Sequence, residues 1–175
     1  MKEQTLLSQC VAVLEQILRI NPGFVSVILH PLSDEALRAA VEQHFAKLRA
    51  DIQFANVADT NLLWVDIRVD GQNGMARELT SVQVEACRKV LETLLALNHE
   101  WADVVLVPLK NASTRDALEY VFQSKGYVVE FYQLNGLAET TGVIIRPPRD
   151  GKLVPLSNAN TRTMVANATS SRMRT

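Results

Sequence analysis

The side chains best suited to chemistry are few, and they stand at the ends of predicted elements. His30 follows a short apolar segment and precedes Pro31, where a buried strand is expected to end. The carboxyl ends of strands are where open α/β sheets present reactive groups, so His30 is the candidate general base. No nucleophile is placed beside it by the sequence, and a structural histidine at an element boundary is the simpler interpretation. His44 and His99 allow the same structural interpretation.

A second candidate is the polar loop between a predicted buried strand and a predicted helix. Free N–H groups at a helix N-terminus favour an anion, and nearby basic and hydroxyl side chains add contacts. The glycine spacing of a phosphate-binding loop is missing, so an ordinary capped helix competes with this anion-site hypothesis. The residues of the candidate anion site are Lys110, Asn111, Ser113, Thr114 and Arg115.

Metal and thiol chemistry find little support in the sequence. Asp66 and Arg68 share one face of a predicted strand, but metal-dependent nucleases usually place a lysine where Arg68 stands, so an ion pair is the simpler explanation. Cys10 and Cys87 fall on apolar helix faces and are expected to be small buried hydrophobes. No Cys or His pair has metal-ligand spacing. We therefore expect no metal and no cofactor.

Hydrophobic periodicity predicts the elements that position these residues. Apolar residues at helical spacing mark four amphipathic helices, and short apolar or alternating segments mark the strands. Asp34 and Glu35 suit the start of the second helix, and Gly126 suits the end of the fourth. The predicted helices cover about 4–19, 34–48, 81–98 and 112–125, and the predicted strands 24–29, 52–57, 62–69, 103–109, 128–134 and 142–146.

The order of these elements predicts an α/β fold in one domain, residues 1–146. A chain of 175 residues with 47% hydrophobic residues is long enough for one sizeable core. The βαβ spacings allow parallel strand pairs, while neighbouring strands favour antiparallel hairpins. We therefore expect a mixed sheet of five to six strands covered by about four helices. The sequence pattern indicates no internal repeat, membrane span or leader segment.

The C-terminal tail, residues 147–175, differs in character from the body. Residues 157–175 are mostly Ser, Thr, Asn, Ala, Met and Arg without a periodic apolar face, which predicts an extended arm. Residues 1–145 hold 12 basic and 18 acidic side chains, whereas residues 146–175 hold six basic side chains and only Asp150. Either the tail meets an acidic partner or it only solubilises the chain end. The basic residues assigned to partner binding are Arg146, directly before the tail, and Arg149, Lys152, Arg162, Arg172 and Arg174 within it.

Three functions follow from these observations. The leading hypothesis is a non-enzymatic protein that forms a homo-oligomer or docks in a larger complex through its arm, as a structural component of a phage-like particle would. The second is a small enzyme or nucleotide-binding domain with its site near His30 and residues 110–115. The third is a nucleic-acid-binding accessory protein that uses the basic tail, although the tail has no aromatic residue for base stacking. We expect a cytoplasmic protein or a component of an assembled particle.

Overall fold

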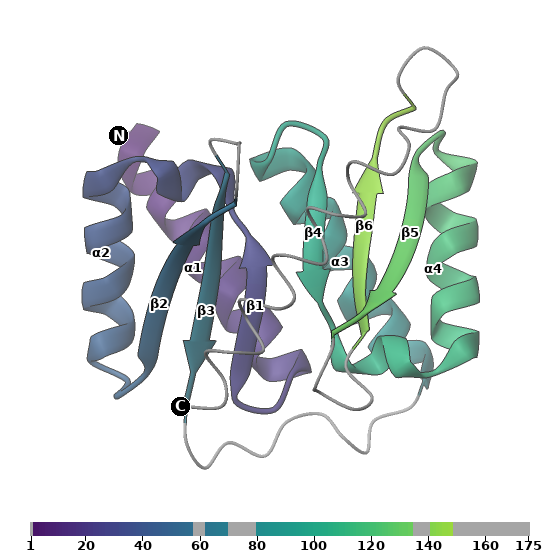
Figure 1. Cartoon of the computed structure of the whole chain (residues 1–175), viewed down its shortest axis with the longest axis horizontal. Helices are drawn as coiled ribbons and strands as arrows, with labels where there is room; N and C mark the ends of the chain where they lie inside the picture. Colours follow the sequence, from purple (N-terminus) through teal and green to yellow (C-terminus); the bar gives the residue numbers. More distant parts are fainter. Residues whose placement is uncertain (1, 58–61, 70–79, 135–140, 149–175) are drawn as a thin grey trace.

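The computed structural model describes residues 2–57, 62–69, 80–134 and 141–148 (Figure 1). The predicted turn at residues 70–74 and all but the first two residues of the predicted tail, 149–175, lie outside the described residues. The helices are α1 (Lys2–Ile20), α2 (Glu35–Ala46), α3 (Thr80–Leu97) and α4 (Ala112–Ser124). The strands are β1 (Phe24–Ile28), β2 (Asp51–Asn56), β3 (Leu63–Arg68), β4 (Ala102–Val105), β5 (Val128–Gln133) and β6 (Thr141–Arg146).

Two short 3-10 helices connect central strands to helices. They cover His30–Ser33 and Val107–Lys110, and each has a proline in its first turn. Proline fixes φ and lacks an N–H group, which suits the start of a helix and not the interior of a sheet. This is why the strand predicted over 103–109 already ends at Val105. The α/β class, the six strands and the four helices are confirmed.

The strand order is β2-β3-β1-β4-β6-β5, and every neighbouring pair among the described strands is antiparallel. The expected mixed sheet with parallel pairs is therefore wrong. The crossover through α2 does return β2 in the direction of β1, but β3 inserts between them. In the same way β6 inserts between β4 and β5. Without these insertions the two crossovers would form the parallel pairs β1-β2 and β4-β5. With them, the sheet has four antiparallel pairs instead, which are β2-β3, β3-β1, β4-β6 and β6-β5.

The chain is an internal duplication, contrary to the expectation of no repeat. The order helix, strand, 3-10 helix, helix, strand, strand runs from α1 to β3 and again from α3 to β6. Val27 of β1 faces Val104 of β4, and these two are equivalent residues 77 positions apart. A pseudo-two-fold axis therefore passes between the two central strands. Pairs identical at this offset include Cys10/Cys87, Leu14/Leu91, Glu15/Glu92, Asn21/Asn98, Pro31/Pro108, Arg38/Arg115, Phe45/Phe122 and Phe54/Phe131.

Two equivalent asparagines join the halves across this axis. The Asn21 side chain donates to the Val105 carbonyl at 2.7 Å and accepts from the Val107 N–H at 2.7 Å. Asn98 makes the same two bonds in the opposite direction, to the Ile28 carbonyl at 2.9 Å and from the His30 N–H at 2.7 Å. Both asparagines are buried. Each satisfies a donor and an acceptor that the partner half leaves at the end of its central strand.

The two faces of the sheet differ. Figure 1 looks onto one face, with α1 and α3 behind the sheet and α2 and α4 beside its two edge strands. Side chains from all four helices and from the rear face of the strands form one hydrophobic core. None of the described helices lies on the face turned to the viewer, which we call the strand face. Its residues are Phe24, Ser26, Ile28, Asp51, Gln53, Ala55, Trp64, Asp66, Arg68, Asp103, Val105, Val128, Glu130, Tyr132, Gly142, Ile144 and Arg146.

Candidate functional site

In the first half, the strand face holds a carboxylate among neutral donors. Ser26 of β1 lies opposite Asp66 of β3, and its hydroxyl donates to Asp66 Oδ1 at 3.0 Å. The Trp64 indole N–H donates to the same oxygen at 3.0 Å. Trp64 itself is buried against Ile28 and Val57. Alternation along β3 puts Trp64 and Asp66 on one face, as the strand pattern predicts.

In the second half, a different carboxylate occupies this face. Asp103 of β4 is 5% exposed and accepts from the Tyr132 hydroxyl at 2.6 Å. Tyr132 lies opposite Gly142, and a Cβ atom at Gly142 would overlap the tyrosine ring. Because Gly142 has no side chain, the ring of Tyr132 can lie over it. This position brings the tyrosine hydroxyl to Asp103.

Arg146 ends β6 on this face, with its side chain only 11% exposed. Its guanidinium donates to Glu130 of β5 at 3.4 Å. Arg146 was predicted both as the end of the last strand and as one of the basic residues assigned to partner binding, and it does end the last strand. The five other basic residues of that group, Arg149, Lys152, Arg162, Arg172 and Arg174, lie outside the described residues.

The structure does not bring His30 and Lys110 together. His30 follows β1 and Lys110 follows β4, and these strands are antiparallel neighbours, so the two residues lie at opposite ends of the sheet. The ring of His30 instead meets the ring of His99 edge-on, with centroids 5.4 Å apart. A shared pocket of His30 with the 110–115 loop is therefore not formed.

In the 110–115 loop, Asn111 caps α4 and Arg115 holds the loop backbone. Asn111 Oδ1 accepts from the Ser113 N–H at 3.0 Å and from its hydroxyl at 2.8 Å. The Arg115 guanidinium turns back to the carbonyls of Leu109 and Lys110, at 2.7 and 3.0 Å. Thr114 is fully buried. This geometry is that of a capped helix, and the anion-site hypothesis gains no support from it.

The remaining reactive side chains are also structurally engaged. Cys10 and Cys87 are free, fully buried thiols, as expected. Burial raises the pKa of Cys10 to about 11 and that of Cys87 to about 12, so neither is a ready nucleophile near neutral pH. His44 pairs with Glu15 at 2.9 Å between α2 and α1. Within the described ranges, no group of three or more metal-ligating side chains could hold a metal ion.

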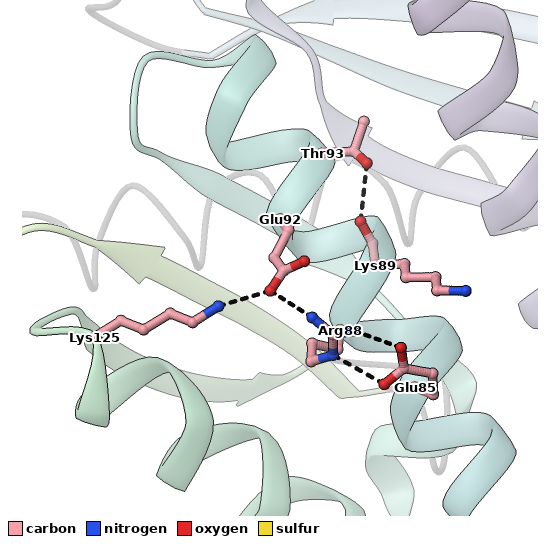
Figure 2. A network of polar contacts seen from close by, with 6 residues as sticks. All are labelled: Glu85, Arg88, Lys89, Glu92, Thr93 and Lys125. Atoms are coloured by element: carbon pink, nitrogen blue, oxygen red, sulfur yellow. Dashed lines mark hydrogen bonds and ion pairs between the residues drawn. The ribbon is translucent and has the colours of Figure 1, made fainter.

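A charged network on the helix side was not foreseen from the sequence (Figure 2). On α3, Arg88 bridges Glu85 and Glu92, and Lys125 at the end of α4 reaches Glu92 at 2.7 Å. The hydrogen bond from Arg88 lowers the pKa of Glu85, and those from Lys125 and then Arg88 lower the pKa of Glu92. The spacing of three and four residues within α3 was the available signal. Lys125 lies 33 residues from Glu92, so no local pattern could have revealed that contact.

The helix layer also carries a shallow groove between α1 and α3, with a volume of about 400 Å³. Arg19, Glu85, Lys89 and the exposed Val82 line it, together with Gln16, Ile20, Ser81 and Ala86. Its lining mixes both charge signs.

Comparisons with protein-family models, curated proteins and solved structures found no match. Among the described helices, none has the length and apolar character needed to span a bilayer. The strand face therefore remains as the candidate site. It combines tryptophan, tyrosine and aliphatic side chains with the carboxylates of Asp66, Asp103 and Glu130 and the guanidinium of Arg146.

Proposed function

We propose that this protein is a non-enzymatic assembly protein that associates with copies of itself or docks in a larger complex through its C-terminal arm. The observation that carries the proposal is the contrast between the two sheet faces. One face is covered by helices, and the other carries aromatic residues and carboxylates without a described helix over it. A sheet face of this composition is suited to protein contact.

The chemistry-bearing residues support a binding role over catalysis. The candidate base His30 contacts His99, the loop at 110–115 caps a helix, and both thiols are buried. Two free thiols fit a reducing compartment such as the cytoplasm. A particle assembled in that compartment is one complex in which such a protein would serve.

The test is the solution mass of the full-length protein, measured by light scattering behind a sizing column. We expect a discrete multiple of 19.5 kDa, and a shift toward the single-chain mass when Arg162, Arg172 and Arg174 are changed together to Glu. A matched control changes Arg19, Lys47 and Lys89 to Glu, which alters the net charge equally on the helix side and should keep the mass. A single-chain mass for the unmodified protein at every concentration, with no partner bound, would contradict the proposal.

A further inference from the structure

The centre of the strand face is buried, although no described helix or strand is stacked on it. Ile28 is 3% exposed, Trp64 2% and Val105 0%. In contrast, Asp51 and Gln53 on the edge strand β2 are exposed. The centre of this face is thus apolar and the β2 edge polar, which is the composition of a surface that another segment can cover.

We propose that the arm, residues 149–175, covers the strand face of its own chain in the unassembled protein. The charges of the strand face and of the arm support this placement. The described charged residues of this face are Asp51, Asp66, Asp103 and Glu130 against Arg68 and Arg146. The arm carries Asp150 against five basic residues, Arg149, Lys152, Arg162, Arg172 and Arg174. An acidic surface and a basic segment attract each other over about a Debye length of 8–10 Å.

The length of the arm also supports this placement. The arm begins immediately after Pro148, two residues beyond the end of β6, and β6 pairs with the central strand β4. Extended residues span roughly 3.3 Å each, so the 27 residues of the arm reach on the order of 90 Å. Crossing all six strands at about 4.8 Å spacing requires only about 24 Å. The arm is therefore long enough to cross the face with ample slack.

The order of residue types along the arm matches the order of residue types across the face. Its first apolar segment, Leu153-Val154-Pro155-Leu156, starts only a few residues after β6. That places apolar side chains within reach of Val105 and Ile144, which lie at the centre of the face. The basic residues beyond it, Arg162, Arg172 and Arg174, are free to extend toward Asp66 and the edge strand β2.

The covering segment belongs to the same chain because tethering favours it. A short flexible connection gives an intramolecular site an effective concentration on the order of millimolar. The arm of a second copy must compete against this value. Assembly through the arm would then require the arm to leave the strand face of its own chain. This release rests on the proposed function, whereas docking of the arm on its own chain does not.

The chain offers a direct reporter of this cover. It has two tryptophans, Trp64 on the strand face and Trp101 immediately before β4. In full-length protein carrying Trp101→Phe, the fluorescence of Trp64 alone reports how easily acrylamide reaches the face. We expect the acrylamide quenching constant to rise by about twofold or more when Arg162, Arg172 and Arg174 are changed to Glu, or when salt is raised to screen the charges. The helix-side control with Arg19, Lys47 and Lys89 changed to Glu should quench like its parent.

Equal quenching in the arm variant, the control and high salt would overturn the proposal. The salt titration uses the parent protein, so a folding defect of the arm variant cannot hide the answer. Protection of Trp64 should also survive about hundredfold dilution, because a tethered cover does not depend on concentration. Protection that disappears on dilution would assign the cover to a second copy instead. The solution mass is read separately, so docking without assembly and assembly without docking give different results.

Discussion

The two halves of the molecule share a frame and differ in what they place on the strand face. Both halves keep an asparagine after the first helix and a proline in the 3-10 helix. On the strand face, the first half has Trp64 on β3 beside Ala55 on β2, whereas the second half has Gly142 and Tyr132 at the equivalent positions. The large and small residues have exchanged strands. The asparagine and proline that shape the backbone are thus the same in both halves, whereas the residues of the strand face differ.

The helix side diverges in a second way. Glu15 and Glu92 are equivalent residues of α1 and α3, but Glu15 pairs with His44 and Glu92 with Arg88 and Lys125. Leu48 occupies the position equivalent to Lys125 and is half exposed. Among the described residues, Glu92 therefore belongs to a network of four charged side chains, whereas Glu15 pairs with His44. Substitutions at equivalent positions can show which of these differences affect stability.

The largest effect is expected at the shared asparagines. Asn21→Ala removes two buried hydrogen bonds and leaves the Val105 carbonyl and the Val107 N–H without their partner. We expect this change to lower the free energy of unfolding by about 2–5 kcal/mol, because each stranded buried group costs about 1–3 kcal/mol. Asn98→Ala should cost a similar amount, because it leaves the Ile28 carbonyl and the His30 N–H in the same state. Urea unfolding of the two variants measures both values.

A matched control is Asn111→Ala, which removes an exposed cap of α4 and should cost only about 1 kcal/mol. If either buried asparagine proves no costlier than this cap, the two-way connection between the halves is not what holds them together. A large cost at one asparagine alone would show that the halves are joined asymmetrically.

The exchanged aromatic pair is expected to give the next largest effect. In Gly142→Ala, the new methyl group overlaps the ring of Tyr132 and displaces its hydroxyl from Asp103. Overpacking of this kind typically costs about 1–3 kcal/mol. In the first half, Ala55→Gly opens space beside Trp64 and should cost only about 0.5–1 kcal/mol through strand entropy. Thermal unfolding compares the two variants. In a Tyr132→Ala background, Gly142→Ala should cost less than it does in the parent, and an equal cost would place the strain elsewhere.

The sequence predicted much of this frame and little of the strand face. Alternation placed Trp64 and Asp66 on one face, and helical periodicity placed Cys10 and Cys87 inside, because both patterns are local. Strand order depends on which strand inserts between two others, and no local pattern encodes that choice. The repeat is not evident from the sequence because its identical residues are scattered over elements whose surface residues differ. The contact of Tyr132 with Asp103 depends on the register of three strands.

A smaller effect is expected where the two halves end their second helices. Arg49 and Gly126 occupy equivalent positions with left-handed backbone, at φ values of 55° and 88°. Nothing lies within 4 Å of a Cβ atom at Gly126, so Gly126→Ala costs only conformational strain, about 1 kcal/mol. Arg49→Gly relieves the same strain and should be neutral or stabilising by up to about 1 kcal/mol. Opposite signs in urea unfolding are expected, and destabilisation by both changes would mean that the Arg49 side chain contributes contacts of its own.

The smallest expected effect concerns the ion network at Glu92. Hydrogen bonds from Lys125 and Arg88 lower the pKa of this carboxyl below its ordinary value of 4.5. A carboxyl with a lowered folded pKa stabilises the protein above its unfolded pKa, and this contribution is lost as the pH falls through the folded value. Because the Glu92 side chain is 35% exposed, solvent screening should limit the contribution to about 0.5 kcal/mol. Glu92→Gln should therefore lower the melting temperature slightly at pH 7, and the difference from the parent should vanish as the pH falls below 4.5. The same comparison for Glu15→Gln tests whether the single pair with His44 behaves alike. A Glu92→Gln difference that persists unchanged in acid would show that Glu92 acts through packing of its side chain rather than through its charge.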